Sequence, residues 1–526
     1  MSEKLKLPVG ISSFEVLREN GFLYVDKTAA IYRMVDEGRY YFMARPRRFG
    51  KTLLVSTLRC LFEGRRELFT GLWIAENTDW AWEPHPVVLL DFNQISHDTP
   101  AILKTSLERE LQLMAQRHQL EIKEPLLEGQ FKALLLGLSE HTGQSVVVLV
   151  DEYDKPIIDH LGRGPDALEI ARANRDVLRY FFGVLKGGDV SRVLRLVFLT
   201  GISRFSKVSI FSELNNLEDL TVSTRYADLL GYTQDELEHD FQPHLTQFAE
   251  VQQISIENAI EQLQHQYDGY RFSPAPVRVY NPFSTLRALR ELRLENYWFE
   301  TGTPAFLVNL LKERQYPLPQ IEQLTAPETI FGTYDLDNLQ PEALLFQTGY
   351  ITITDIEGRL YHFGYPNQEV KTAFLETLLY TFAGENKRPL STHVVRLAGH
   401  LRREDFDAFF ETIQAIFASI PYTLNTQRNE AYFHTLFYLM VSASGVEARS
   451  ELLTSRGRID LAVEFSEAVF IMEFKCGQSP HVALRQIAEQ GYAERYRGSG
   501  KRLWAMGLEF DTEERNLVAW DVEALN

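Results

Sequence analysis

The sequence has little cysteine and no long hydrophobic run. Only two of its 526 residues are cysteines, and Cys60 and Cys476 lie far apart. A disulfide framework is therefore excluded, and a reducing interior is the simplest setting. The longest apolar stretches, such as Val146–Val150, fall far short of the ~18 residues that indicate a membrane span. Residues 1–6 lack the apolar region of a signal peptide. We therefore expect a cytoplasmic protein with no membrane partner.

Positive charge is also scarce. The 54 Lys and Arg residues are outnumbered by 72 Asp and Glu residues, which gives a net charge of −18. So acidic a chain is not a general nucleic-acid coat, and we expect any contact with nucleic acid to be local and assisted by metal. Low-complexity tracts and fixed-period repeats are absent, and hydrophobic residues make up 45%. This balance is typical of a globular protein, here with roughly three to four domains by length.

The pattern of apolar residues divides the chain into three parts. Residues 1–235 alternate apolar strands with amphipathic helices, which predicts a parallel sheet covered on both faces. Residues 236–385 are mostly helical, and residues 386–526 form a third α/β unit. In the first part we expect strands Tyr40–Ala44, Val87–Phe92, Val146–Val150 and Val193–Thr200, and helices Ala101–His118 and Glu169–Leu185. In the third we expect helices Arg403–Ala418, Glu430–Val441 and His481–Tyr496, and strands Glu447–Leu453, Arg458–Phe465, Ala468–Phe474 and Leu503–Leu508.

The first strand is followed by a motif typical of a phosphate-binding loop. It opens the amphipathic helix that begins at Lys51 and reads Arg45-Pro46-Arg47-Arg48-Phe49-Gly50-Lys51-Thr52. Backbone N–H groups and the helix N-terminus would cradle phosphates, Lys51 would reach the β- and γ-phosphates, and Thr52 would bind Mg²⁺. Arg45 replaces the first glycine of the general pattern. The alternative is a basic turn that caps an ordinary helix.

Two further strands end in polar residues that suit the same chemistry. The strand at Val146–Val150 is followed by Asp151, which would lie near Mg²⁺, and by Glu152, which would act on an attacking water. We expect this strand to lie beside the P-loop strand; the alternative is a core strand whose aspartate caps the next helix. Thr200 would sense the γ-phosphate, and Arg204 and Lys207 would donate charge or simply be solvated.

The third part carries a pattern typical of metal-dependent nucleases. Asp460 opens one strand and Glu473-Phe474-Lys475 ends the next. Residues i and i+2 share a face of a strand, so Glu473 and Lys475 point the same way and Phe474 packs into the core. If the strands pair, Asp460 comes beside Glu473, and the two carboxylates suit Mg²⁺ or Mn²⁺. Lys475 would serve the attacking water, and Glu430 would add a ligand or a base.

The surroundings of this pattern leave an alternative open. Gln486 and Tyr492, on the next helix, would contact the substrate backbone or the metal shell. Alternating charges on a solvent face are common, so Glu473 and Lys475 could equally form a surface ion pair. A nearby basic cluster would offer a local nucleic-acid surface or a solvated rim; it consists of Arg495, Arg497, Lys501 and Arg502.

The combined motifs resemble those of the bacterial AAA-ATPase-like proteins that commonly carry a C-terminal PD-(D/E)XK nuclease-superfamily domain. The resemblance covers nearly the whole chain. Its motifs are residues 7–10, 24–28, 45–52, 151–157, 199–205, 214–217, 267–272, 280–284 and 298–304, then Asp460, residues 473–475 and residues 490–493. In this family the P-loop usually begins with Arg, so Arg45 fits.

The resemblance implies an α/β fold in three parts. These are a P-loop NTPase (AAA-like) domain, a helical lid or connector, and a restriction-endonuclease-like domain. It implies ATP and Mg²⁺ or Mn²⁺ as cofactors and nucleic acid, DNA in the first place, as partner, with homo-oligomerisation left open. We therefore expect an ATPase that regulates a nuclease, in defence or mobile-element conflict. The rivals are a P-loop switch whose C-terminal domain binds without cutting, and a non-enzymatic protein that keeps nucleotide as a structural ligand.

Overall fold

A computed structural model gives the fold of the chain as two compact units. The structure describes residues 4–204, 210, 216–298, 307–308, 310–311, 314, 316, 318–331, 340–383, 387–420, 430–454 and 457–525. The first unit comprises residues 1–310 and 325–369, and the second residues 311–324 and 370–526. Within the described ranges, no helix is long and apolar enough to cross a membrane. The three-part division of the chain stays a prediction.

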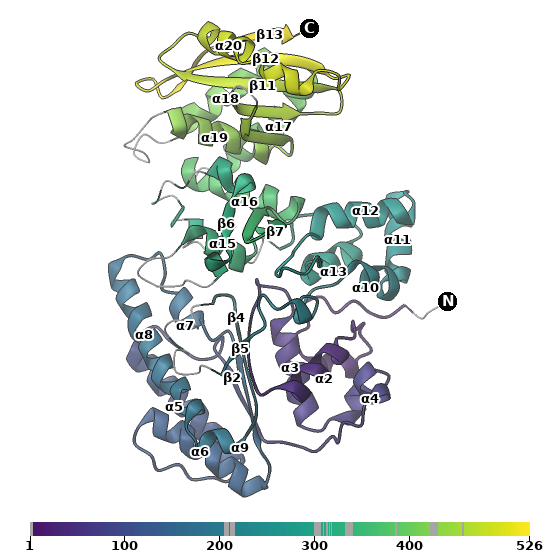
Figure 1. Ribbon diagram of the computed structural model, residues 1–526, viewed down its shortest axis with the longest axis vertical. Coiled ribbons are helices and arrows are strands. Elements are labelled where there is room, and N and C mark those ends of the chain that lie inside the picture. The colour runs from purple at the N-terminus through teal and green to yellow at the C-terminus, as the bar shows by residue number, and fades with distance from the viewer. Residues whose placement is uncertain are drawn as a thin grey trace. The chain divides into compact units, whose positions relative to one another are not determined.

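The first unit, in which Figure 1 shows helices on both sides of a central sheet, is built on five parallel strands in the order β2-β3-β4-β1-β5. Its central strands read as continuous apolar runs because both faces of the sheet are covered. One face packs on α1, α2 and α3, and helices α5, α6 and α8 lie on the other side. The strands are β1 Tyr40–Ala44, β2 Val87–Asp91, β3 Val146–Asp151, β4 Leu194–Gly201 and β5 Glu218–Asp219.

The helices of this part include the three that the sequence predicts, which begin at Lys51 or span residues 101–118 and 169–185, and these three have closely similar bounds. They are α1 Phe14–Glu19, α2 Thr28–Glu37, α3 Lys51–Phe62, α4 Trp73–Asn77, α5 Pro100–Arg117, α6 Leu127–Thr142, α7 Lys155–Ile158, α8 Pro165–Gly183 and α9 Val190–Val193. Thr99 caps α5 by accepting a hydrogen bond from Ile102, with Pro100 at the first helical position. The predicted α/β class with a helix-covered parallel sheet is confirmed.

One expectation about this sheet is wrong. The strand that ends in Asp151 does not lie beside the P-loop strand, because β4 pairs with both and separates them. Sequence order does not determine the order of parallel strands, since each crossover helix can place its strand on either side. The two motifs still meet, because α3 leaves β1 and packs across β3.

The rest of the first unit is mainly helical, as predicted, with one small sheet. The helices are α10 Gln234–Asp240, α11 Gln242–Gln252, α12 Ile256–Tyr267, α13 Pro282–Glu291 and α15 Pro341–Thr348, and a sheet in the order β6-β8-β7 contains Thr325–Pro327, Leu360–Gly364 and Thr352–Glu357. Helices α10 to α13 share a core with the N-terminal segment at Leu23 and Val25. Helix α16, Gln368–Ala383, begins at the end of this unit and continues into the second.

The second unit is an α/β domain with a mixed five-stranded sheet in the order β13-β12-β11-β10-β9. Only β11 and β12 run parallel. Ile471 of β11 packs on the α20 side, whereas Phe474 packs against Phe437 of α19 on the other. The elements are α17 Lys387–Arg402, α18 Phe406–Ser419, α19 Glu430–Ala443, β9 Glu447–Leu453, β10 Arg458–Glu464, β11 Ala468–Cys476, α20 Pro480–Glu489, β12 Arg502–Asp511 and β13 Asn516–Leu525.

Candidate functional site

The P-loop connects the buried strand β1 to helix α3. Gly50 caps α3 with a φ of 90°, a conformation that glycine adopts without steric cost. Lys51 is buried, and its Nζ donates hydrogen bonds to the carbonyls of Arg45 at 2.9 Å and Pro46 at 3.0 Å. Burial lowers the pKa of Lys51, whereas the nearby Glu152 and Asp151 raise it. The lysine is therefore held inside the loop that it would serve.

Thr52 and Asp151 meet although 99 residues separate them. The Thr52 hydroxyl donates to Oδ2 of Asp151 at 2.7 Å. Asp151 is only 2% exposed, and its Oδ1 has no hydrogen-bond partner among the described residues. Burial raises the pKa of Asp151 to about 6. A carboxylate oxygen without a partner beside a hydroxyl is a donor set that fits Mg²⁺.

The two carboxylates after Asp151 lie in different environments. Glu152 is half-buried and has a φ of 51°, a left-handed conformation that is strained for a residue with a side chain. Asp154 is buried and accepts hydrogen bonds from the Ser203 and Ile202 N–H groups, at 2.6 and 3.0 Å, and from the Ser203 hydroxyl at 2.6 Å. Asp154 thus fixes the segment after β4. Sequence reasoning gave it no role, although it lies in the same motif.

The predicted sensor residues have other partners. The buried Thr200 hydroxyl donates to the Met43 carbonyl at 2.8 Å. The Arg204 guanidinium is buried against Asp219, to which its Nε donates at 3.0 Å. Arg204 also contacts the carbonyl of Phe331. Lys207 lies outside the described residues.

Arg45 is buried in the fold. Its Nη1 donates to the carbonyls of Ala44 at 3.0 Å and Thr221 at 2.6 Å, and its guanidinium lies 4.4 Å over the Phe272 ring. Burial lowers the pKa of Arg45 to about 9, whereas Asp219 raises it. At this position the arginine therefore fills space that a glycine would leave empty.

Aromatic residues of the middle region cover the rest of the P-loop. The Trp298 indole donates to the Arg47 carbonyl at 3.1 Å, and the Arg48 guanidinium lies 4.6 Å over the Phe283 ring. Phe49 packs edge-on against Tyr270 and Phe272, with ring centroids 4.8 and 5.3 Å away. A Cβ on Gly349 would lie 2.6 Å from the Pro46 ring. Packing thus holds the loop in shape.

A mainly apolar cavity lies beside the P-loop. It is bordered by Phe49, Gly50 and Leu53 from the loop and its helix. The N-terminal segment and the segment before α10 close it with Pro8, Tyr24, Val25, Leu230 and Tyr232. An apolar cavity next to a phosphate-binding loop could hold the flat base of a nucleotide.

In the second unit, Asp460 and Glu473 come together as the pairing of their strands requires. Leu461 pairs with Met472, so the register sets Asp460 opposite Glu473. Asp460 accepts a hydrogen bond from the Phe474 N–H at 2.9 Å. Lys475 Nζ lies 3.1 Å from Glu473 Oε1, and this carboxylate is only 2% exposed. Burial, and then the nearby Asp460, raise the pKa of Glu473 to about 8.

The other predicted residues of this site lie at different depths. Gln486 of α20 donates to Glu473 Oε1 and lies 3.4 Å from the Tyr492 hydroxyl. Glu430 is exposed at the start of α19. Burial, and to a smaller extent the negative charge of Glu430, raise the pKa of Cys476 to about 11. Glu473 Oε2 has no hydrogen-bond partner among the described residues. Together with Asp460 this oxygen fits a hard divalent cation, although no described group of three or more His, Cys, Asp and Glu side chains surrounds it.

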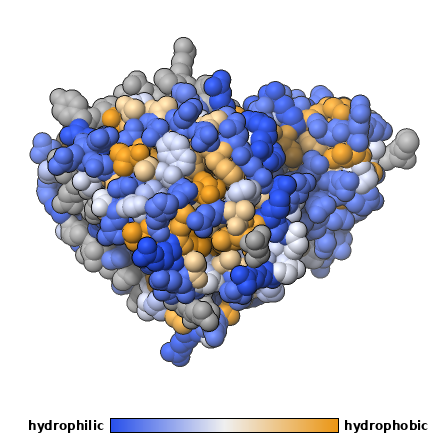
Figure 2. Space-filling view, turned by 90° about the horizontal axis from the view of Figure 1, so that it is seen from above, coloured by the Kyte–Doolittle hydropathy of each residue, from blue (hydrophilic) through white to orange (hydrophobic). Residues whose placement is uncertain are grey.

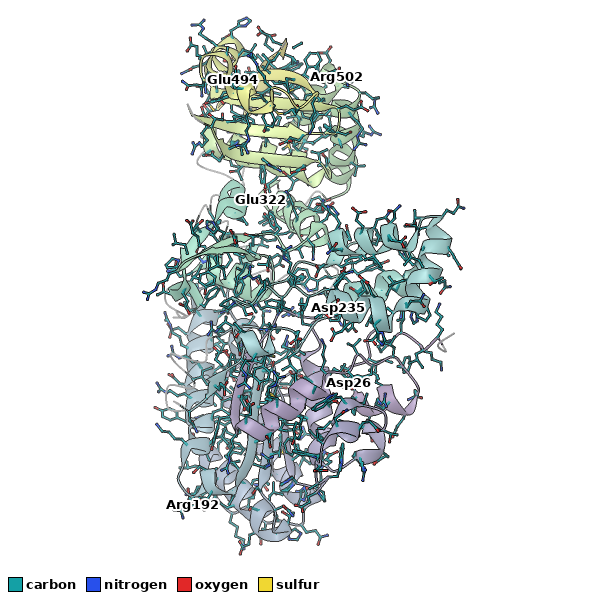
Figure 3. The ribbon with its side chains drawn as sticks, turned by 45° about the vertical axis from the view of Figure 1, so that its right-hand side comes forward. Asp26, Arg192, Asp235, Glu322, Glu494 and Arg502 are labelled. Atoms are coloured by element: carbon teal, nitrogen blue, oxygen red, sulfur yellow. The ribbon has the colours of Figure 1, made fainter. Side chains whose placement is uncertain are left out.

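The predicted basic cluster is largely neutralised. Arg497 pairs with Glu494 at 2.9 Å and Arg502 with Glu404 at 3.1 Å; Glu494 and Arg502 are labelled in Figure 3. Lys501 pairs with Glu464 at 3.5 Å, and Arg495 has a partner as well. The face seen in Figure 2 shows hydrophobic patches between hydrophilic residues. A continuous basic surface is therefore not formed by these four residues.

Comparisons with known proteins match the regions that carry the two sites to protein families. Residues 8–211 match a protein family described as "Predicted AAA-ATPase", and residues 428–520 match the PD-(D/E)XK nuclease superfamily. An uncharacterized protein in the vnfD 5' region of Azotobacter chroococcum mcd 1 is 37% identical over 541 residues, with the full length of both chains covered. The chain belongs to the family of predicted AAA-ATPases that carry a C-terminal PD-(D/E)XK nuclease-superfamily domain.

Proposed function

We propose that this protein binds and hydrolyses ATP with its first unit and thereby regulates a Mg²⁺-dependent nuclease in its second. The nuclease would cleave phosphodiester bonds of nucleic acid, DNA in the first place, in defence or mobile-element conflict. The observation that carries the proposal is shared by both units. In each unit a buried carboxylate has one oxygen without a described hydrogen-bond partner, and a second oxygen-bearing side chain lies beside it. These oxygens are Asp151 Oδ1 in the first unit and Glu473 Oε2 in the second.

The nucleotide chemistry follows from the residues around Asp151. Thr52 and Asp151 would hold the metal ion, which offsets phosphate charge when bound. Lys51 exchanges the carbonyls of Arg45 and Pro46 for the phosphates, and the first N–H groups of α3 bind the same anion. Glu152 orients the attacking water and takes its proton. The apolar cavity beside Gly50 receives the base.

The nuclease chemistry uses the second pair of carboxylates. Asp460 and Glu473 would hold the metal ion, and Lys475 orients the attacking water beside them. Gln486 of α20 holds Glu473, and the Tyr492 hydroxyl in turn accepts a hydrogen bond from Gln486. The raised pKa of Glu473 reflects a buried carboxyl group that ionises readily only when a cation offsets its charge.

A second candidate is a regulatory ATPase whose C-terminal domain binds nucleic acid without cutting it. The small number of carboxylates around Glu473 favours this candidate, because the described residues supply a pair and not a group of three. The two candidates differ in one measurable property, cleavage of a phosphodiester bond.

The test is a nuclease assay of the full chain. Single- and double-stranded DNA and RNA are incubated with Mg²⁺ or Mn²⁺, with and without ATP. We expect metal-dependent cleavage whose rate changes with ATP. The Glu152→Gln protein should bind ATP but turn it over at least ~100-fold more slowly, since the amide cannot accept a proton. Binding without cleavage of any substrate would leave the regulatory ATPase as the function.

A further inference from the structure

Two side chains that are far apart in the sequence hold the carbonyl groups of the P-loop. Lys51 donates to the carbonyls of Arg45 and Pro46, at 2.9 and 3.0 Å. The next carbonyl, that of Arg47, instead accepts a hydrogen bond from the Trp298 indole at 3.1 Å. Trp298 is 1% exposed and belongs to the middle region of the first unit. The orientation of the loop main chain therefore depends on a side chain outside the nucleotide motifs.

The hydrogen bond from Trp298 fixes the direction of one peptide group. The bond between Arg47 and Arg48 is trans, so its C=O and N–H point in opposite directions. Because the carbonyl faces the indole, the Arg48 N–H points away from it. Arg48 has a φ of 69° and Gly50 a φ of 90°. Left-handed residues in a turn bring successive N–H groups into a concave site for an anion. The turn therefore has the backbone conformation of an anion site, and Trp298 holds one of its peptide groups.

Trp298 is itself fixed by buried groups. Its main-chain N–H donates to Oε1 of Glu369 at 2.8 Å, and the Ser284 hydroxyl donates to the same oxygen at 3.0 Å. Glu369 is 0% exposed. The Trp298 ring packs edge-on against Tyr350, with ring centroids 5.4 Å apart. Since both its main chain and its ring are held, the indole loses little further freedom when it binds the Arg47 carbonyl.

We propose that Trp298 is a positioning residue of the phosphate site, which holds the Arg47–Arg48 peptide group so that the Arg48 N–H donates to a phosphate of the nucleotide, and that Glu369 anchors Trp298. The inference rests on the proposed ATP function of the first unit. Neither Trp298 nor Glu369 touches the nucleotide; both act through the loop. A main-chain donor contributes most to affinity when it is already aimed at its ligand, because turning a peptide group costs part of the binding energy.

Trp80 offers a matched control in the same unit. Its ring also packs among aromatic residues, with centroids 5.7 Å from Phe62 and 6.3 Å from Tyr32. Its indole nitrogen is buried but has no hydrogen-bond partner among the described residues. Trp80→Phe thus removes an indole N–H that no described carbonyl accepts, whereas Trp298→Phe removes the one that Arg47 accepts.

The test measures nucleotide binding by the full chain, through titration with a fluorescent ATP analogue and competition by unlabelled ATP and by adenosine. Adenosine carries no phosphate, so its affinity reports the contacts of the base and the ribose alone. Trp298→Phe should weaken ATP binding about fivefold, since one hydrogen bond is lost, and leave adenosine binding within about twofold of the wild type. In steady-state hydrolysis, KM for ATP should rise by the same factor while kcat changes little. Trp80→Phe should change none of these.

Glu369 supplies a second pair of variants that leaves the indole in place. Glu369→Gln keeps an acceptor for the Trp298 N–H, so its ATP affinity should stay within about twofold of the wild type. Glu369→Met is similar in length but offers only a weakly accepting sulfur, so its ATP affinity should fall as in Trp298→Phe. A merely structural role would lower the thermal midpoint of Glu369→Met and leave the ATP affinity of the folded protein unchanged, or would weaken ATP and adenosine binding alike. Either result would overturn the inference.

The outcomes separate this inference from the proposed function. If the wild type binds ATP and Trp298→Phe binds it as Trp80→Phe does, the inference falls and the ATP site stands. If the wild type binds ATP but neither hydrolyses it nor cuts nucleic acid, the proposed function falls, and the ratio of ATP to adenosine affinity in Trp298→Phe still decides the inference. If the wild type binds no nucleotide, both fall.

Discussion

Glu369, in the first turn of α16, offers a quantitative test of how the first unit holds its P-loop. Its side chain is 0% exposed, and Oε1 accepts hydrogen bonds from the Trp298 N–H at 2.8 Å and the Ser284 hydroxyl at 3.0 Å. Oε2 has no hydrogen-bond partner among the described residues. Burial raises the pKa of Glu369 from 4.5 to about 8. The carboxyl group is therefore protonated in the folded protein at neutral pH.

The sign of the pH dependence follows from this shift. The folded state binds the proton more tightly than the unfolded state, so the contribution of Glu369 to stability is complete below pH 4.5 and is lost as the pH rises to 8. At about 1.4 kcal/mol per pH unit, the loss is about 5 kcal/mol in all. Glu369→Gln has a similar shape but no proton to lose. The free energy of unfolding of the wild type should thus fall by that amount relative to the variant.

The assay is thermal unfolding of the two full-length proteins at several pH values. At roughly 2 °C per kcal/mol for a unit of this size, the thermal midpoint of the wild type should lose about 10 °C relative to Glu369→Gln between pH 4.5 and 8. The measured quantity is how the difference in thermal midpoint between the two proteins changes with pH. Any effect of the amide that does not depend on pH therefore cancels. Parallel profiles for the two proteins would refute the burial of an unpaired carboxyl at this position.

Three further changes test the two sites. Lys51→Ala should weaken ATP binding at least ~100-fold. The thermal midpoint of the nucleotide-free protein should not fall, because the variant no longer buries an ammonium group. Unchanged affinity in a fluorescent-nucleotide titration would contradict the P-loop assignment. Gly349→Ala should destabilise the first unit by about 2 kcal/mol and weaken ATP binding, since its Cβ meets Pro46, whereas Gly358→Ala should leave ATP binding unchanged. Lys475→Ala should abolish cleavage of DNA while ATP turnover and the thermal midpoint stay near wild type; equal cleavage would show that the nuclease site lies elsewhere.

Local patterns in the sequence were sufficient for much of the fold. The strand at Tyr40–Ala44 and the strand at Glu447–Leu453 have the predicted bounds, because alternation and apolar runs are properties of a few consecutive residues. One helix predicted over His481–Tyr496 is broken, since Gly491 has a φ of 62° after α20 ends at Glu489. Strand β13 was not predicted at all, because its mixed polar sequence becomes a strand only by pairing with β12.

The candidate site divides in the same way. The spacing of Glu473 and Lys475 placed both on one face of a strand without any knowledge of the fold, and the order of Lys51, Thr52 and Asp151 indicated a nucleotide motif. These are local statements about period and composition. The resulting roles stay predictions, and the structure supplies the geometry that makes them testable.

Only the tertiary structure decided which distant groups meet. It placed β4 between the two nucleotide-motif strands, buried Arg45 and Arg204 around Asp219, and packed Trp298 on the P-loop. These contacts depend on crossover direction and on packing between segments more than a hundred residues apart, which no local periodicity encodes. Glu451 is a further case: its φ of 56° lies in the left-handed region within strand β9, and the pairing of β9 with β10 sets it opposite Asp460.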